Sequence, residues 1–301
     1  MESKYVTVDG LRTHYLEAGD GSPVVLLHGG EPPGGVSCSH VWHKNIDVLA
    51  LAHRVIAPDL IGYGQSDNPS TNDGYRVDLM ASTLAGLLRQ LDIKGATVIG
   101  TSRGAFHATY LAMVAPDLVG KLVLTNSASL TPHYAANVVD QHPLVSSGYF
   151  KGDAANARHD LEGLNYDPST VEDECVERVA AMLRMPHRMQ AQKDFVRGSS
   201  EWDDYRADLQ EKKDALLNWI RTDGAFDVPV GIIWGASDVG TTVDDGLALF
   251  QLFAETEASV RFLLFDRCGH RPFMERPEEF NSWVLTFTGA IGADDLRLST
   301  A

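Results

Sequence analysis

Short apolar runs recur along the first and last parts of the chain, and they predict its strands. Most of these runs are continuous rather than alternating, which is typical of a strand buried on both faces of a parallel sheet. Two alternating stretches, 5–8 and 13–16, flank Asp9-Gly10 and predict a hairpin at the antiparallel edge of the same sheet. The continuous runs lie at 23–27, 54–59, 96–99, 121–125, 228–235 and 260–265.

Helical patterns separate the predicted strands. Apolar residues recur at helical spacing in 77–91, and a further helical pattern begins at about residue 105. Helices are also expected at 243–254 and 277–290. Strands that alternate with helices indicate an α/β protein with a mostly parallel sheet, here of eight strands, wrapped by helices on both faces.

The middle of the chain interrupts this alternation. From 130 to 226 no buried strand is predicted, but amphipathic stretches occur at 170–185, 189–195 and 202–220. We therefore predict three parts, listed here as residues 1–129 (first part of the core), 130–227 (helical cap) and 228–301 (second part of the core). Ligands bind at the carboxyl end of open α/β sheets, so a cap at that end would shield the pocket from water.

The chain is acidic, with 41 Asp and Glu against 25 Lys and Arg and a formal net charge of −16. Nucleic acids and anionic membranes are bound by clustered positive charge, so neither is expected as a partner. The chain has neither an apolar stretch of membrane-spanning length nor a secretory signal pattern, which predicts a cytoplasmic protein. The oligomeric state stays open, and a homo-oligomer is compatible with the sequence.

The three cysteines Cys38, Cys175 and Cys268 are odd in number and widely spaced. This pattern argues against a disulfide framework and against a zinc site. We expect no metal and no cofactor. Cys268 stands two residues before a histidine, and we interpret it as a packed small side chain rather than a second nucleophile.

A Gly-x-Ser-x-Gly motif at 100–104 lies between a predicted strand and a predicted helix. This context is that of a nucleophile elbow, a sharp turn that exposes a serine hydroxyl at the end of a strand. Ser102 would occupy the tip of the turn. Gly100 and Gly104 would remove side chains that collide where the strand and the helix cross.

A serine hydroxyl is a weak nucleophile, and it needs a base that is itself oriented by a third group. His270 follows the predicted strand 260–265, and Asp238 follows the strand 228–235. The order Ser102, Asp238, His270 is the one expected when three strand ends of such a sheet meet at one edge. His270 would accept the Ser102 proton, and Asp238 would orient the imidazole.

The oxyanion hole is predicted to combine the N–H of Arg103 with the N–H of either Gly30 or Glu31, in the glycine-rich loop after the strand 23–27. His28, before that loop, is interpreted as a structural hydrogen-bonding residue. Asp244 and Asp245 are interpreted as acids at the N-terminus of a helix rather than as catalytic carboxylates.

With these motifs the chain resembles the α/β-hydrolase superfamily, and within it the meta-cleavage product hydrolases, which split a carbon–carbon bond in ring-opened dienoates. The resemblance covers nearly the whole chain. It implies an α/β-hydrolase fold with a cap and a serine-dependent activity. It rests on 27–30, 58–67, the elbow, 166–169, 234–246, 268–270 and 278–281.

Several positions depart from the pattern of that subfamily. Thr101 stands where Asn usually precedes the nucleophile, and Glu31 stands where a third glycine usually follows His-Gly-Gly. Arg271 replaces the tryptophan that usually follows the histidine. The cap arginine of the subfamily aligns with Val179, and Arg178 lies one position early.

Thr101, Arg178 and Arg271 are candidate substrate-binding residues. Arg103 and Arg271 adjoin the nucleophile and the base in sequence, and a guanidinium binds carboxylate in a bidentate manner. One or both could hold an acidic or oxygen-rich group of a small-molecule substrate. Pairing with acids of the protein, or exposure to solvent, is an equally weighted alternative.

The sequence therefore predicts a cofactor-independent serine hydrolase that acts on a small activated ketone or ester. Carbon–carbon cleavage of a dienoate is the first hypothesis, and hydrolysis of an ester or lactone is the second. A ligand-binding protein that retains the three residues without catalysis is the alternative from another class. Attack by Ser102 and attack by an activated water are both open for the carbon–carbon substrate.

Overall fold

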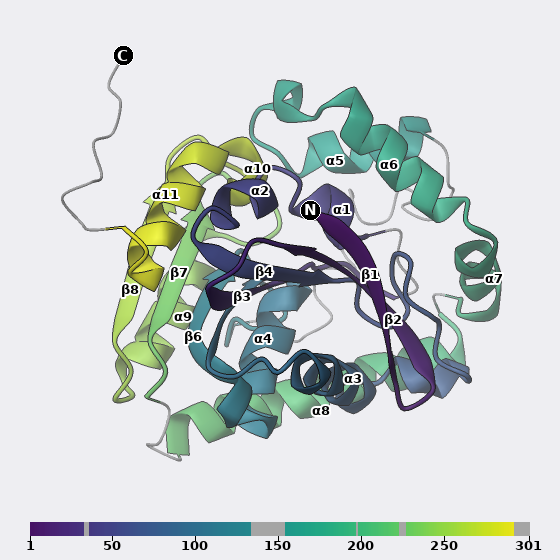
Figure 1. Cartoon of the computed structure of the whole chain (residues 1–301), viewed down its shortest axis with the longest axis horizontal. Helices are drawn as coiled ribbons and strands as arrows, with labels where there is room; N and C mark the ends of the chain where they lie inside the picture. Colours follow the sequence, from purple (N-terminus) through teal and green to yellow (C-terminus); the bar gives the residue numbers. More distant parts are fainter. Residues whose placement is uncertain (33–35, 134–153, 197, 223–226, 292–301) are drawn as a thin grey trace.

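The structure is a computed structural model, and it describes residues 1–32, 36–133, 154–196, 198–222 and 227–291. Its eight strands form one sheet in the order β1-β2-β4-β3-β5-β6-β7-β8 (Figure 1). β1 pairs antiparallel with β2, β2 pairs antiparallel with β4, and the remaining pairs are parallel. The strands are β1 (Glu2–Val8), β2 (Leu11–Ala18), β3 (Ser22–Leu27), β4 (His53–Pro58), β5 (Ala96–Thr101), β6 (Val119–Thr125), β7 (Val230–Gly235) and β8 (Val260–Phe265).

Helices cover both faces of this sheet. On one face α3, α4, α8 and α9 pack against one another, and on the other face α11 packs against α2. The α-helices are α1 (Cys38–Val41), α2 (Ile46–Leu49), α3 (Val77–Gln90), α4 (Arg103–Val114), α5 (Ala154–Gly163), α6 (Asp173–Leu183), α7 (Pro186–Asp194), α8 (Ser200–Thr222), α9 (Val243–Ala254), α10 (Pro272–Glu275) and α11 (Pro277–Thr288). Single 3₁₀ turns are η1 (Asn72–Tyr75), η2 (Pro116–Leu118) and η4 (Pro168–Thr170).

The core lies along the central strands, whose side chains are buried on both faces. All residues of β5 and β7 are buried, as is the second half of β3. The two edge strands β1 and β8 keep exposed or partly exposed positions through most of their length. The continuous apolar runs of the sequence correspond to these strands, which confirms the predicted mostly parallel sheet of eight strands.

The predicted helices 77–91, 243–254 and 277–290 are confirmed to within two residues at each end as α3, α9 and α11. Sequence analysis missed α1, α2 and α10, because a helix of four residues is too short to show a period. It also missed α5, in which only Ala157, Asp160 and Leu161 are buried.

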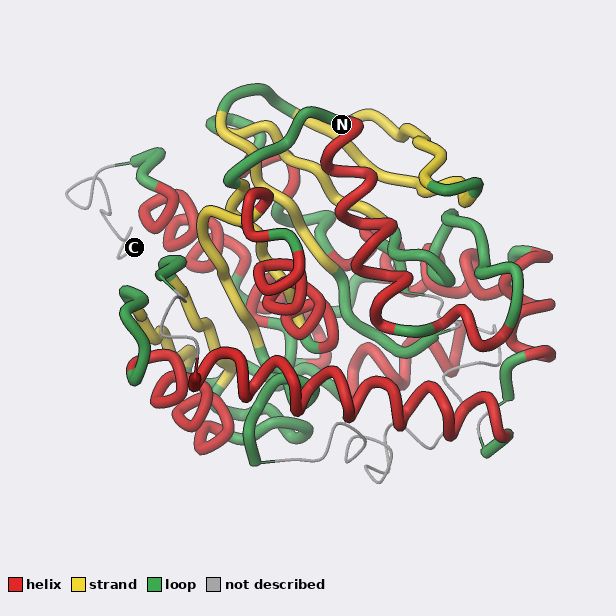
Figure 2. The backbone as a smooth tube through the Cα atoms, turned by 90° about the horizontal axis from the view of Figure 1, so that it is seen from below, coloured by secondary structure: helices red, strands yellow, loops and turns green. Residues whose placement is uncertain are grey.

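The described part of the predicted cap is entirely helical in its regular structure. α5, α6 and α7 form a row along one side of the molecule, whereas the long helix α8 crosses beneath the sheet and packs on α3, α4 and α9 (Figures 1 and 2). The division at 129 and 227 stays a prediction. Residues 134–153 and 223–226 of the predicted cap, and 292–301 of the second core part, lie outside the described residues.

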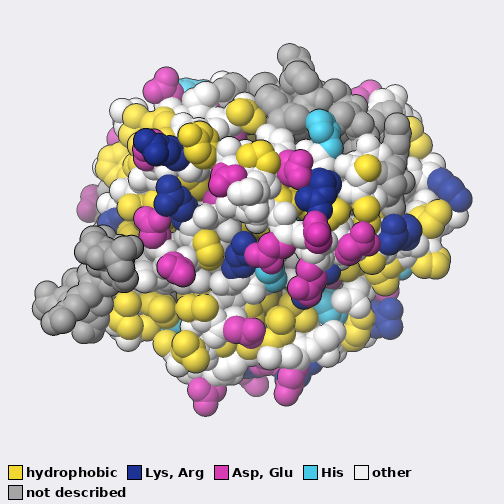
Figure 3. Space-filling model, turned by 90° about the horizontal axis from the view of Figure 1, so that it is seen from above, with side chains coloured by type: hydrophobic (Ala, Val, Ile, Leu, Met, Phe, Trp, Pro, Cys, Tyr) yellow, Lys and Arg dark blue, Asp and Glu magenta, His cyan; other side chains and the backbone are white. Residues whose placement is uncertain are grey.

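Charged side chains of both signs are mixed on one face of the molecule. On the face shown in Figure 3, the described Lys and Arg side chains lie among Asp and Glu and form no continuous basic patch. Non-specific binding to phosphate backbones depends on clustered cations, which this face does not offer. Among the described helices, none combines the length and the apolar character that a membrane span requires.

Glu275 joins the helical segment, residues 154–222, to the loop after β8. Its carboxylate accepts hydrogen bonds from the backbone N–H groups of Tyr166 at 2.8 Å and Gly269 at 2.9 Å. A third backbone contact runs from the N–H of His270 to the carbonyl of Leu164 at 2.8 Å. The turn after α5 is therefore fixed directly to the carboxyl end of the sheet.

Glu275→Ala is expected to loosen this junction, because two backbone N–H groups lose a charged acceptor. Such hydrogen bonds contribute about 1.5–3 kcal/mol each, so hydrogen exchange of the Tyr166 and Gly269 amides should accelerate by about tenfold or more. Glu279→Ala serves as the control, because Glu279 is half-exposed and its ion pair within the described part of the chain is with Arg276. Equal exchange rates in the two variants would contradict the prediction.

Candidate active site

Ser102 lies between the end of β5 and the first residue of α4, with φ 52° and ψ −123°. Few non-glycine residues adopt a positive φ, and such strain is concentrated at functional sites. A Cβ atom on Gly100 would overlap the carbonyl of Gly104, and a Cβ atom on Gly104 would overlap the carbonyl of Leu27. The close crossing of β5, α4 and β3 therefore requires both glycines, as the motif predicts.

The backbone of Ser102 is held by the end of the neighbouring strand β6. Its N–H donates to the carbonyl of Thr125 at 2.9 Å. Its carbonyl accepts from the hydroxyl of Ser127 at 2.6 Å and from the N–H of Ala105 at 3.0 Å. Both backbone polar groups of the strained residue are thus satisfied, so the elbow is fixed in place.

Asp238 and His270 are in direct contact at the ends of β7 and β8, where Nδ1 of His270 lies 2.7 Å from Oδ2 of Asp238. Asp238 also accepts from the N–H of Gly240 at 2.7 Å and from the hydroxyl of Thr241. Burial alone would raise the pKa of Asp238, but the charge of His270 and these hydrogen bonds lower it. An ionised carboxylate accepts the Nδ1 proton, which leaves Nε2 of a neutral ring as an acceptor.

Asn126, which follows β6, connects the acid to the elbow. Its side-chain amide donates to Oδ2 of Asp238 at 2.7 Å, and its side-chain carbonyl accepts from the N–H of Gly235 at 3.1 Å. The next residue, Ser127, is the one that holds the carbonyl of Ser102. Sequence analysis missed both residues. The signal that could have identified Asn126 and Ser127 was their position directly after a buried strand, at the end of the sheet where Ser102 lies.

The structure brings Ser102, Asp238 and His270 to the same end of the sheet. Among the described residues, the hydroxyl of Ser102 and the ring of His270 do not form a hydrogen bond. Catalytic hydrogen bonds are often long before substrate binds and shorten in the reacting complex. The His270 side chain is 13% exposed, so the ring lies at the boundary between the protein and its surroundings.

The glycine-rich loop after β3 lies against the elbow. A Cβ atom on Gly29 would lie 2.7 Å from Cβ of Ser102 and 3.4 Å from the N–H nitrogen of Arg103. Gly30 has a φ of 92°, in the left-handed region. The side chain of Arg103 does not extend into solvent: its Nη2 lies 2.7 Å from Oε1 of Glu31 in a largely buried ion pair. The three predicted oxyanion-hole residues are therefore neighbours.

Two structural interpretations from the sequence are confirmed. His28 is fully buried, its Nδ1 lies 2.8 Å from the carbonyl of Gly29, and its Nε2 accepts from the N–H of Leu60 at 3.0 Å. Burial lowers the pKa of His28, which favours the neutral ring. Asp245 forms a capping box with Thr242 at the start of α9, so it stabilises a helix terminus.

The two candidate positions in the cap differ in environment. Val179 is buried within α6, whereas Arg178 is partly exposed. Nη1 of Arg178 donates to the carbonyl of Ser39 in α1 at 3.0 Å, and Nη2 pairs with Glu174 one helical turn away. Arg178 therefore links α6 to the core, and its role in substrate binding stays a prediction.

Arg271 also contacts the helical segment. Its Nη1 donates to the carbonyl of Leu161 at 2.8 Å and to Oδ1 of Asn165 at 3.3 Å. Thr101, the residue before Ser102, is buried at the end of β5. The substrate-binding roles proposed for Arg271 and Thr101 stay predictions as well.

Lys213 in α8 is a buried cation near the elbow that sequence analysis did not single out. It is 1% exposed, and its Nζ donates to the carbonyl of Ala128, just beyond the loop that holds Ser102, at 3.3 Å. Burial lowers the pKa of Lys213 to about 8, so its charge changes close to neutral pH. A lysine in the polar-looking middle of an amphipathic helix carries no sequence signal of this kind.

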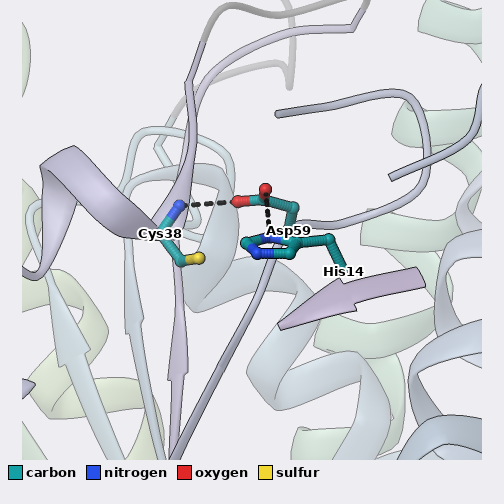
Figure 4. A group of neighbouring side chains, drawn as sticks. All are labelled: His14, Cys38 and Asp59. Carbon is teal, nitrogen blue, oxygen red and sulfur yellow. Dashed lines mark hydrogen bonds and ion pairs between the residues drawn. The ribbon is translucent and has the colours of Figure 1, made fainter. Parts of the chain in front are cut away.

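His14, Cys38 and Asp59 form a buried group with metal-ligand chemistry (Figure 4). Oδ2 of Asp59 contacts Nδ1 of His14 at 2.8 Å and the N–H of Gln65 at 2.9 Å, and Oδ1 accepts from the N–H of Cys38 at 2.8 Å. Burial raises the pKa of the Cys38 thiol well above its usual range, which disfavours the thiolate that binds metals. These contacts indicate a hydrogen-bond network that joins β2, the end of β4 and α1.

A mostly parallel sheet covered by helices, with a strained serine at a strand-to-helix turn and an Asp–His pair at neighbouring strand ends, defines the α/β-hydrolase class. Residues 22–277 match the family model for the alpha/beta hydrolase fold. The chain belongs to the α/β-hydrolase family.

Two relatives with the same name align with nearly the whole of this chain. It is 33% identical over 293 residues to a 2-hydroxy-6-oxononadienedioate/2-hydroxy-6-oxononatrienedioate hydrolase of Burkholderia vietnamiensis, with 95% of each chain covered. A protein of the same name from Paraburkholderia phymatum is 33% identical over 296 residues, covering 95% of this chain and 96% of the relative. The solved meta-cleavage product hydrolase of Pseudomonas fluorescens superposes with a TM-score of 0.76 at 27% identity, covering 95% of this chain and 97% of that one.

The contribution of the buried Asp59 network to stability can be tested by substitution. This network links β2, the end of β4 and α1. Asp59→Asn removes the charge that His14 and two backbone N–H groups contact, and it should lower the free energy of unfolding by about 3 kcal/mol at pH 7. Denaturant titration measures this loss. Asp117→Asn is the control, because Asp117 is exposed and contacts Arg89 at 3.4 Å, a pair worth at most about 1 kcal/mol.

The difference in the free energy of unfolding between wild type and Asp59→Asn should depend on pH. Burial raises the pKa of Asp59, but the contacts with His14 outweigh it and hold the pKa well below its usual range. A carboxyl with a lowered folded-state pKa stabilises above its unfolded value of about 4, and this stabilisation fades as the pH falls below that value. A gap between wild type and Asp59→Asn that grew on acidification would contradict the assignment.

Proposed function

We propose that this hydrolase of the α/β-hydrolase family uses Ser102 as nucleophile, His270 as general base and Asp238 as the orienting acid. The observation that carries this proposal is the 2.7 Å contact between His270 and Asp238 at the strand ends beside the strained Ser102. The names of the relatives support carbon–carbon cleavage of a ring-opened oxo-dienoate as the reaction.

The first chemical step is nucleophilic attack. Nε2 of His270 takes the proton of the Ser102 hydroxyl as Oγ forms a bond to the substrate carbonyl carbon, and the carbonyl oxygen becomes an oxyanion. The N–H of Arg103 and one from the Gly30–Glu31 loop would stabilise that negative charge. Collapse of the intermediate re-forms the carbonyl and breaks the bond to the leaving group, which takes the proton from His270.

The second step releases the acyl group. His270 accepts a proton from water while the water oxygen attacks the acyl carbon, and the bond to Oγ of Ser102 breaks as the serine regains the proton. A dienol substrate needs a prior proton shift to its keto form so that the broken bond can leave its electrons on a stabilised carbon. We assign assistance of this proton shift to His270 as well.

The second candidate function is hydrolysis of an ester or lactone. It is favoured by one observation, the buried Val179 at the cap position where the resemblance to meta-cleavage product hydrolases implies an arginine. Without that cation, the acidic end of a dienoate has to be bound by other groups. An ester or lactone without an acidic group does not need a cation at this position.

Comparison of substrates separates the two candidates. We expect kcat/KM for a 2-hydroxy-6-oxo-dienoate, measured by loss of the dienolate absorbance, to exceed that for p-nitrophenyl esters of matched size by about tenfold or more, because dienoate cleavage is the activity of the relatives. A reversed ratio would favour the ester or lactone. Arg178→Ala and Arg271→Ala should raise KM for the dienoate if either side chain holds its acidic group.

Substitutions in the triad test the mechanism itself. Ser102→Ala should abolish turnover and labelling by a fluorophosphonate, since the nucleophilic oxygen is gone. Asp238→Asn should lower kcat by about 10⁴-fold, because an amide favours the wrong imidazole tautomer. Asp244→Asn changes an exposed acid at the start of α9 and should leave kcat unchanged. Labelling without turnover of any dienoate or ester would instead favour a ligand-binding protein.

A further inference from the structure

Asn126, the first residue after β6, combines burial with a left-handed backbone. Its φ is 34°, and it is 0% exposed. Of the non-glycine residues with a positive φ in the described part of the chain, it is the one that is fully buried. Such strain persists only where surrounding contacts maintain it, and it is concentrated at functional sites. At this turn the side chain of Asn126 contacts Asp238, whereas the side chain of Ser127 contacts the backbone of Ser102.

Two contacts fix the orientation of the Asn126 amide. Its side-chain carbonyl accepts from the N–H of Gly235 at 3.1 Å, and its amino end lies 2.7 Å from Oδ2 of Asp238. The reverse orientation would place the carbonyl against a carboxylate oxygen and the amino group against an N–H, which are two unfavourable contacts. Gly235 is the last residue of β7, the strand that precedes Asp238. Asn126 is therefore a donor to Asp238, and β7 holds it in that role.

Donors surround the carboxylate of Asp238. Oδ1 accepts from the N–H of Gly240 at 2.7 Å. Oδ2 accepts from the hydroxyl of Thr241 and from the amide of Asn126, and the same oxygen lies 2.7 Å from Nδ1 of His270. An ionised carboxylate offers about four acceptor sites, so these donors saturate it. The Asp238 side chain is 0% exposed, so a donor that is lost is not replaced by solvent.

We propose that Asn126 is a positioning residue whose amide holds the carboxylate of Asp238 in the orientation that contacts His270. The left-handed backbone at residue 126 is the conformation that lets the side chain reach Asp238. This inference rests on the proposed serine mechanism and deepens it, because Asn126 acts on the orienting acid and not on the substrate. Its effect on turnover depends on an N–H donor at residue 126, and that dependence can be tested.

Asn126→Gly is the first test, because it removes the amide and keeps the backbone: glycine adopts a positive φ without strain. The substrate is the 2-hydroxy-6-oxo-dienoate or the p-nitrophenyl ester, whichever wild type cleaves faster. We expect kcat to fall by about tenfold or more with KM within about twofold, since loss of the orienting acid itself costs about 10⁴-fold. Asp92→Gly is the matched control: Asp92 has a φ of 56° and is exposed at the end of α3, so its kcat should equal that of wild type.

Asn126→Asp tests the donor by pH. The new carboxyl keeps the shape of the amide, but it donates to Asp238 only while it is protonated. Two carboxyls in contact resist ionising together, so their shared proton has a raised pKa. Below that pKa the donor is present, and above it two like charges meet. The kcat/KM of the variant, divided by that of wild type, should therefore fall by about tenfold or more between about pH 5 and pH 9.

The ratio isolates the carboxyl pair from the other titratable side chains that interact with Asp238. His270 is common to both enzymes, which is the reason for dividing by the wild-type value. Burial raises the pKa of the Cys268 thiol, so Cys268 stays neutral over this range. A role in packing alone would lower activity by the same factor at every pH.

Two results would overturn the inference: a wild-type kcat in Asn126→Gly, or a ratio for Asn126→Asp that stays constant with pH. If Asn126→Gly does not fold, the pH dependence of Asn126→Asp decides alone. If either result is found while Ser102→Ala is inactive, only the inference fails. If Ser102→Ala retains activity, the proposed function fails as well.

Discussion

The close crossing of three backbone segments at Ser102 is the constraint on which the site depends. The end of β5, the start of α4 and the end of β3 approach so closely that Gly100, Gly104 and Gly29 have no room for a Cβ atom. The serine between them takes a positive φ that only surrounding contacts can maintain. The Thr125 carbonyl and the Ser127 hydroxyl supply such contacts, so Ser102 is positioned by β6 as much as by its own strand.

The segment that follows β6 organises the neighbouring charges as well. Asn126 binds Asp238 and the backbone of β7 at Gly235, while Ala128 accepts a hydrogen bond from the buried Lys213. The elbow at Ser102, the end of β6, the end of β7 and helix α8 thus meet at residues 126–128. Polar groups buried in this way are costly unless they are fully satisfied, so such a network specifies one arrangement of the strand ends. The positions of Asp238 and Ser102 are consequently set by one loop.

Much of the fold could be predicted because parallel strands and their helices leave strong periodic signals. Six continuous apolar runs and two alternating stretches predicted the eight strands, and the Gly-x-Ser-x-Gly motif located the strained turn at Ser102. Helices of four residues left no such signal. The partners of Arg103, Arg178 and Arg271 could not be predicted either, since a guanidinium reaches acceptors that are distant in sequence, such as Glu31, Ser39 and Leu161. Asn126 was missed because a single amide after a strand has no motif.

The backbone contact between His270 and Leu164 couples the imidazole to the helical segment above it. Any displacement of that segment, whether to admit a substrate or to release a product, has to break this hydrogen bond and to disturb the loop that carries the ring. A shift of this segment would therefore also change the position of His270, the residue that we propose as the general base. The same contact would keep the proposed base aligned with Asp238 for as long as the turn after α5 stays against the loop after β8.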